Sequence, residues 1–212
     1  MIPIPPPLFC ENLPDNLHCC QCCVRMVLAA FGQDTTLEDI DSALQFQPGL
    51  FTWTISAAAL LAERINGVAI YSQLNYRRFA EEGEAYLAEY WAPDWYSNQK
   101  QHASPNFERE RKQAVEVLQT AKFENRRLSS DEIYQILSRG DLVITSLDHG
   151  ILNSTPITFG HSVLAYGVRG PDVRLHDPGP PPTKSRRVKW LTFIKALRTA
   201  AELIVISRNK TE

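Results

Sequence analysis

The sequence predicts an α+β fold, because helical patterns dominate its first part and strand patterns its last third. Three early segments have apolar residues at spacings of three and four, as amphipathic helices do: 19–31, 37–44 and 54–64. The later strand-like segments are 142–147, 161–168, 173–176 and 203–207. Because helices and strands do not alternate as in βαβ units, we expect N-terminal helices packed on a C-terminal antiparallel sheet.

The first two helices have recognisable ends. In the first, the residues that share one face are Cys19, Cys23, Met26, Val27 and Ala30. Gly32 is a suitable stop after them. Thr35 and Glu38 have the spacing of a capping box, which predicts the start of the helix over 37–44. A third helix over 54–64 precedes a short strand over 68–71, which follows the turn Asn66-Gly67.

The middle of the chain differs in composition from its flanks. Residues 76–122 are charged, aromatic and helix-forming, with the aromatic run Tyr90–Tyr96 and a polar segment around His102 as interruptions. We interpret 76–122 as a helical insertion in a single domain that spans 1–212. The aromatic run predicts a surface buried against its own domain.

The last third predicts the sheet. Ser129 and Glu132 have capping-box spacing, which predicts a helix to Ser138, followed by a buried strand over 142–147. A loop is expected over 148–160. The turn-forming residues 169–172 then join two strands into a hairpin. We interpret 184–189 as a solvated loop, and expect a helix near 190–200 before the final strand.

Composition excludes several classes of function. Lys and Arg number 22 against 24 Asp and Glu, a net charge of −2, so no overall field recruits nucleic acid or an anionic membrane. No run of 18 apolar residues predicts a membrane span, and the proline-rich start is unlike a secretory signal. Five cysteines, four of them within 19–23, suit a reducing compartment, so we expect a cytoplasmic protein.

The cysteine cluster allows several interpretations. Cys19 with Cys22 and Cys20 with Cys23 have CxxC spacing, but no second CxxC or HxxxH completes a zinc site, so we expect no metal. A redox CxxC normally follows a strand in a βαβ unit, which this sequence lacks. A thiol at a helix N-terminus is favoured as a thiolate nucleophile. Cys22 and Cys23, one turn inside the helix, fit small core residues.

A nucleophilic thiol needs a base and a group that orients the base. His161 begins one strand of the predicted hairpin and Asp177 ends the other, so both fall at the same end of the sheet. His176, one residue earlier, is expected to point to the opposite face. The residues Cys19, His161 and Asp177 therefore form a candidate triad.

These segments resemble the C39-like cysteine peptidases of the papain-like superfamily. The resemblance rests on Cys19, on Met26-Val27-Leu28 with Phe31-Gly32, and on the segments Gly160–Gly167 and His176-Asp177-Pro178. Cys23–Leu28 and Trp53-Thr54-Ile55 are closest to the guanylyl-cyclase-like branch of that fold. The resemblance covers most of the chain outside roughly 72–125, and it implies a papain-like fold.

Carried over by position, the resemblance makes Cys19 the nucleophile, His161 the general base and Asp177 the residue that orients the imidazole. It implies hydrolysis or acyl transfer on a peptide or other amide, without a cofactor. The family's glutamine upstream of the nucleophile is missing, which leaves Asn12 and Asn16 as candidate oxyanion donors. The family's glycine after the nucleophile is Cys20, which remains an alternative nucleophile and a candidate cleft residue.

Other candidates and functions stay open beside the triad. Trp53 and His149 are candidate cleft residues, although both also fit ordinary loop positions. The missing glutamine favours, as an alternative, a catalytically inactive binding module. A nucleotide cyclase is the third possibility, but the sequence has no phosphate-binding glycine loop and no paired carboxylates on one helix face. Zinc binding through the CxxC pairs is the least supported alternative.

Overall fold

The architecture is α+β, as the sequence predicts. The computed structural model describes residues 4–103, 107–156, 159–197 and 202–208, and these contain ten helices and seven strands. The helices are α1 (Cys19–Ala30), α2 (Leu37–Leu44), α3 (Thr54–Arg64), α4 (Tyr76–Glu82), α5 (Glu84–Tyr90), α6 (Pro93–His102), α7 (Glu108–Thr120), α8 (Ser130–Ser138), α9 (His149–Asn153) and α10 (Trp190–Ala196). The strands are β1 (Val68–Tyr71), β2 (Lys122–Glu124), β3 (Leu142–Asp148), β4 (Gly160–Arg169), β5 (Asp172–Asp177), β6 (Thr183–Lys189) and β7 (Leu203–Ile206).

All seven strands belong to one mixed sheet, in the order β2-β1-β7-β3-β4-β5-β6. The expectation of a C-terminal antiparallel sheet is therefore only partly correct. Five neighbouring pairs are antiparallel, but β1 and β2 pair in parallel, and both lie in the first two thirds of the chain. A parallel pair needs a long connection, and the helices α4 to α7 supply it.

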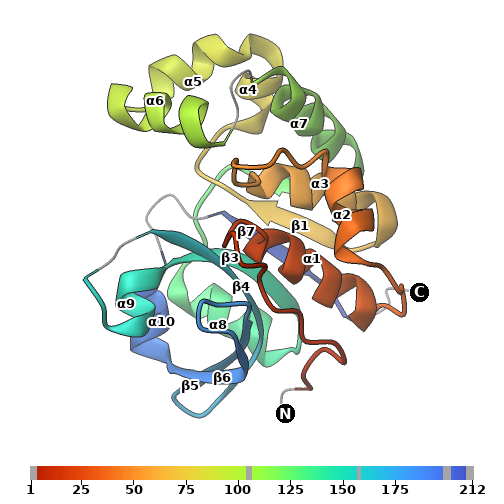
Figure 1. Ribbon diagram of the computed structural model, residues 1–212, viewed down its shortest axis with the longest axis vertical. Helices are drawn as coiled ribbons and strands as arrows, with labels where there is room; N and C mark the ends of the chain where they lie inside the picture. Colours follow the sequence, from red (N-terminus) through yellow and green to blue (C-terminus); the bar gives the residue numbers. More distant parts are fainter. Residues whose placement is uncertain (1–3, 104–106, 157–158, 198–201, 209–212) are drawn as a thin grey trace.

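The two faces of the sheet carry two separate cores. Because side chains alternate along a strand, β7 gives Ile204 and Ile206 to one core and Leu203 and Val205 to the other. The first core also contains α1, α3, α4 and α7, and the second contains α8 and α10. Figure 1 shows α1 crossing the middle of the molecule, with α8, α9 and α10 below it.

The segment 76–122 forms a helical layer, as expected. Helices α4 to α7 lie at the top of Figure 1, away from β4, β5 and β6. The prediction of a buried aromatic run is only partly correct: Trp91 packs on Trp53 with ring centroids 5.4 Å apart, as does Phe107 further along, but Tyr90 and Trp95 are exposed. The expected interruption around His102 is confirmed, because α6 ends at His102 and the next helix, α7, begins at Glu108.

Three other expectations about local structure need correction. The capping box of α2 is formed by Thr36 and Asp39 instead of Thr35 and Glu38, although the helix itself spans Leu37–Leu44 as predicted. The segment 184–189 is not a solvated loop but most of β6, which pairs with β5. The expected loop at 148–160 contains α9. The end of the helix expected near 190–200 lies outside the described residues.

The capping box of α8 is confirmed, with Ser129 and Glu132 exchanging hydrogen bonds with each other's backbone N–H groups. The hairpin of β4 and β5 also has the predicted orientation. His176 and Asp177 point to different surroundings: the His176 ring packs on Phe9 and Tyr166, whereas Asp177 contacts His161.

The amino-terminal segment, residues 4–18, connects the end of β5 with the start of α1. The Asn12 N–H donates to the Pro178 carbonyl at 3.0 Å. The His176 ring approaches the Pro6 carbonyl at 3.5 Å and packs on Phe9. This segment therefore lies against the same strand end that carries Asp177.

Helix α1 contains an unusual core residue. Gln21 is 0 % exposed, and neither its amide nitrogen nor its amide oxygen has a hydrogen-bond partner among the described residues. An amide that is buried without partners loses its hydration and gains nothing in exchange. The unpaired amide of Gln21 therefore lowers the stability of the folded protein.

Replacing Gln21 with leucine should raise the free energy of unfolding by about 1–2 kcal/mol, because the change removes two unpaired polar atoms at similar volume. Urea unfolding followed by circular dichroism measures the change. Gln135→Leu, at an exposed position of α8, is the control and should change stability by less than about 0.5 kcal/mol. A Gln21→Leu variant no more stable than the wild type would contradict the expectation.

Candidate active site

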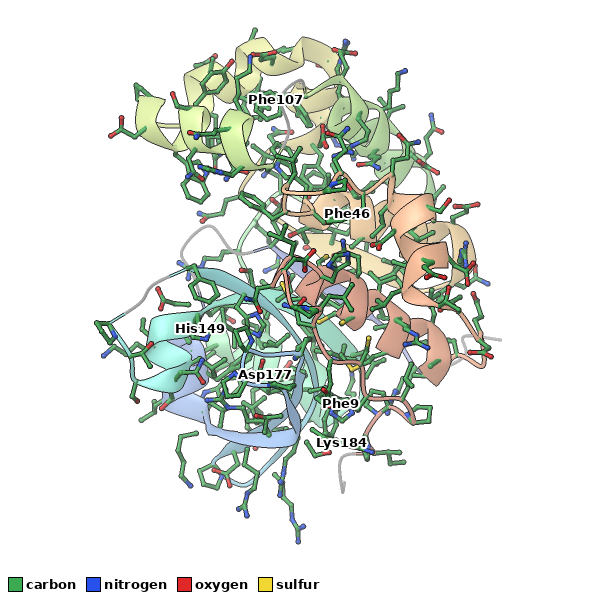
Figure 2. The ribbon with its side chains drawn as sticks, viewed as in Figure 1. Phe9, Phe46, Phe107, His149, Asp177 and Lys184 are labelled. Atoms are coloured by element: carbon green, nitrogen blue, oxygen red, sulfur yellow. The ribbon has the colours of Figure 1, made fainter. Side chains whose placement is uncertain are left out.

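Three elements bring the predicted triad to one place. Cys19 is the first residue of α1, His161 lies at the start of β4, and Asp177 is the last residue of β5. His161 and Asp177 meet because β4 and β5 are joined by a tight turn and run antiparallel. Figure 2 labels Asp177 and His149 in the half of the molecule formed by β4, β5, β6 and α9.

His161 and Asp177 form a buried pair. Nε2 of His161 and Oδ1 of Asp177 are 2.6 Å apart, and each side chain is 2 % exposed. The Asp177 carboxylate also accepts from the Gly179 N–H at 3.0 Å and from Arg186 Nη1 at 2.6 Å. Burial alone would raise the pKa of Asp177. The hydrogen bond and charge of His161 and the hydrogen bonds from Gly179 and Arg186 outweigh burial and hold this pKa below its usual value.

Arg186 is a site residue that the sequence interpretation missed. Its guanidinium donates to Asp177, to Asn153 Oδ1 at 2.8 Å and to the Leu152 carbonyl at 2.6 Å. It thereby joins β6 and α9 to the carboxylate. The available signal was the basic run 184–189 shortly after Asp177, because a third strand there places a cation beside the carboxylate.

Cys19 is the one cysteine that is not fully buried. Burial would raise the pKa of its thiol, but the hydrogen bond and charge of His161 and hydrogen bonds from Ser162 outweigh it, and the pKa lies below the usual value. Helix α1 adds to this effect. Within the described residues no side chain caps its N-terminus and no acidic residue lies in its first turn, so its positive end is available to an anion.

His161 shows the complementary shift. Burial would lower the pKa of its imidazole, but hydrogen bonds to Asp177 and Cys19 and the charges of both groups raise it to about 9. Because Nε2 is engaged by Asp177, Nδ1 is left to face the thiol. The two opposite pKa shifts therefore favour a thiolate at Cys19 paired with an imidazolium at His161.

Ser162 is a second residue that the sequence interpretation did not single out. Its backbone N–H and its side chain both stabilise the Cys19 thiolate, and its side chain also contacts the Cys20 thiol. Its place directly after His161 on β4 was the available signal. Two neighbouring residues of one strand thus contact the thiol at the start of α1.

The remaining cysteines of the cluster have a different character. Cys20, Cys22 and Cys23 are at most 5 % exposed. Burial raises the pKa of the Cys20 and Cys23 thiols, so both stay protonated. Among the described residues, no group of three or more His, Cys, Asp or Glu side chains is arranged to hold a metal ion.

The two candidate oxyanion donors occupy different places. Asn12 Oδ1 accepts from the His18 N–H at 2.8 Å, and its Nδ2 donates to the Gly179 carbonyl at 3.3 Å. Asn12 therefore links the residue before Cys19 to the loop after Asp177. Asn16 is exposed, in a left-handed turn with φ of 60°.

Only glycine fits at position 179, where the loop after β5 contacts Asn12 and Asp177. The φ of Gly179 is +90°, and a Cβ there would overlap the backbone of Pro181 and Pro182. With no side chain, its N–H reaches Asp177 and its carbonyl accepts from Asn12. The loop after β5 thus supports both the carboxylate and the amino-terminal segment.

The structure separates the other two cleft candidates. His149 lies beside the pair: its ring is edge-on to that of His161 at 6.0 Å and stacks on Phe159 at 4.2 Å, with Nε2 2.9 Å from the Pro180 carbonyl. Trp53 is instead buried in the aromatic cluster below the insertion. At 9 % exposure Trp53 offers a substrate little surface, so the structure does not support it as a cleft residue.

No family model matches the chain, and no curated protein sequence matches it. In the parts of the chain described above, the helices are all too short or too polar to span a lipid bilayer.

Arg186→Gln should lower the free energy of unfolding by about 2–4 kcal/mol, because it removes the cation from a buried, charged carboxylate. Urea unfolding at pH 7 gives the difference. Arg187→Gln is the matched control on the same strand: Arg187 pairs with Asp172 at 2.9 Å, but its side chain is 65 % exposed against 19 % for Arg186. The control should lose less than about 1 kcal/mol, and equal losses would refute the special role of Arg186.

Proposed function

We propose that this protein is a thiol hydrolase or acyl transferase of papain-like fold, acting on a peptide or other amide bond. The observation that carries the proposal is the buried His161–Asp177 pair at 2.6 Å beside the half-buried thiol of Cys19. The nucleophile, the base and its orienting carboxylate come from three elements and meet at one sheet end. The resemblance to C39-like peptidases supports the same assignment.

The chemistry follows from the two shifted pKa values. The Cys19 thiolate attacks the carbonyl carbon, and the carbonyl oxygen becomes an oxyanion. When the C–N bond breaks, the His161 imidazolium gives its proton to the leaving amine, and a thioester remains on Cys19. Water, or an acceptor amine, then attacks the thioester while neutral His161 takes the proton, and the thiol is regenerated.

The oxyanion would be held by the start of α1. The first backbone N–H groups of a helix have no partners within the helix, and the helix dipole favours a negative charge there. The N–H of Cys19 is the donor closest to the reacting atom. The Asn12 side chain is hydrogen-bonded to the backbone of His18 and of Gly179. These bonds hold the start of α1 beside Asp177.

A binding module without turnover is the second candidate. Two observations favour it: the Asn12 amide already has partners, and the residue after Cys19 is a cysteine where the related peptidases have glycine. Such a protein would keep a reactive thiol and would not complete the reaction. Reactivity of Cys19 and turnover are therefore tested separately.

Cys19 should react with iodoacetamide faster at pH 6 than Cys20, Cys22 or Cys23, because His161 and Ser162 hold the pKa of its thiol below the usual value while burial raises that of the others. Reactivity should fall as the pH drops through the pKa of Cys19. In His161→Ala, the hydrogen bond and the charge of His161 are lost and only the Ser162 hydrogen bonds oppose burial, so the rate at pH 6 should fall about tenfold or more. Rates are measured by mass spectrometry for each cysteine.

Cys20→Ala is the control for this experiment and should leave the rate of Cys19 within about twofold. If Cys20 labels faster than Cys19, or if His161→Ala leaves the rate at pH 6 unchanged, the assignment of the nucleophile is wrong.

Turnover is tested with a library of fluorogenic peptide amides. The wild type should release amine, Cys19→Ala should release none, and His161→Gln should be slower by about 10²-fold or more. A wild type that is alkylated rapidly at Cys19 yet releases no amine would favour the binding module.

A further inference from the structure

A second pair of thiols lies apart from the candidate triad. Sγ of Cys10 and Sγ of Cys22 are 3.0 Å apart, and both residues are free cysteines. Cys10 belongs to the amino-terminal segment and Cys22 to α1, twelve positions further along the chain. Since sulfurs in a disulfide are about 2.0 Å apart, a bond here requires an approach of about 1 Å.

The surroundings of Cys10 favour its thiolate. The Arg25 guanidinium lies 4.0 Å from Cys10 Sγ and is held in place by the Thr35 carbonyl at 2.7 Å. Arg25 and Cys22 are three residues apart on α1, so they share a face and approach Cys10 together. The hydrogen bond from Cys22, opposed by burial and assisted by Arg25, lowers the pKa of Cys10 to about 7.

Cys22 is the complementary partner. The hydrogen bond to Cys10 and burial raise the pKa of its thiol, so it keeps its proton. Its sulfur also lies 3.2 Å from the Glu11 carbonyl, which is an alternative acceptor for the one S–H proton when Cys10 does not take it. The pair thus consists of a thiolate beside a cation and a thiol in contact with it, the environment in which cysteines become reactive.

We propose that Cys10 and Cys22 form a reversible disulfide, a redox modification site separate from Cys19. Hydrogen peroxide is the oxidant. The Cys10 thiolate attacks one peroxide oxygen, the O–O bond breaks, and Cys10 sulfenic acid forms with the release of hydroxide. Cys22 then attacks the Cys10 sulfur, the S–O bond breaks, and hydroxide leaves. The proton of Cys22 and one from solvent convert the two hydroxides to water, so two thiols and one peroxide give one disulfide.

The bond would close a covalent loop around the candidate nucleophile. Residues 10–22 include Cys19, and they include Asn12 and His18, whose hydrogen bond links the segment to the start of α1. Oxidation would fix the amino-terminal segment against α1 and leave the Cys19 thiol outside the bond. The inference does not depend on the proposed function, because neither Cys10 nor Cys22 has a part in the amide chemistry.

The test uses the full chain and a stoichiometric amount of hydrogen peroxide. After alkylation of free thiols under denaturing conditions, cleavage after glutamate separates the two cysteines: peptide 1–11 contains Cys10 alone, and peptide 12–38 contains the other four. We expect the two peptides to be joined, with fragmentation assigning the bond to Cys22. Dithiothreitol should separate them. The same crosslink should form in Cys19→Ser, which lacks the proposed nucleophile.

Two buried cysteines of α1 give a matched pair of variants. Cys22→Ala should abolish the crosslink, and Cys23→Ala, equally buried at 0 % exposure, should retain it. The oxidised wild type should melt about 5 °C or more above the reduced form, because the disulfide lowers the conformational entropy of the unfolded chain. A free, alkylated peptide 1–11 after peroxide treatment, or a bond from Cys10 to Cys23, would overturn the proposal.

Discussion

The burial of the Asp177 carboxylate is the constraint on which the candidate site depends. A carboxylate that is 2 % exposed must have hydrogen-bonding partners on every side, because an unpaired buried charge costs several kcal/mol. The partners are His161 on β4, Gly179 after β5 and Arg186 on β6. Satisfying one charge therefore fixes three strands, one loop and, through Arg186, the end of α9. The same charge holds His161 in the protonated form that Cys19 needs.

The amino-terminal segment completes this arrangement from the other side. It contacts β5 through Phe9 and the loop after β5 through Asn12. Asn12 also accepts from the backbone of His18, directly before Cys19. The position of the candidate nucleophile relative to Asp177 is thus set by short polar contacts as well as by packing of α1. Cys10 and Cys22 belong to the same junction, which explains why two thiols outside the candidate triad come into contact there.

Five similar side chains acquire different chemistry from their surroundings. Cys19 is half-buried at an uncapped helix start beside an imidazolium, so it favours the thiolate. Cys20 and Cys23, one and four residues later, are buried, and burial favours the thiol. Cys10 is made acidic by Cys22 and Arg25. The order of residues within the run of cysteines gives none of these differences; they arise from what each sulfur contacts.

The sequence by itself determined the helices with strong periodicity and end signals, α1, α3 and α8 among them, and the hairpin that brings His161 to Asp177. Those features depend on local propensity and on one tight turn, so they are encoded within a few residues. Only the tertiary structure decided that 183–189 is a strand, that Arg186 binds Asp177 and that Trp53 is buried. The reason is physical: β6 gains its stability from pairing with β5, and Arg186 and Trp53 take their roles from partners distant in the sequence.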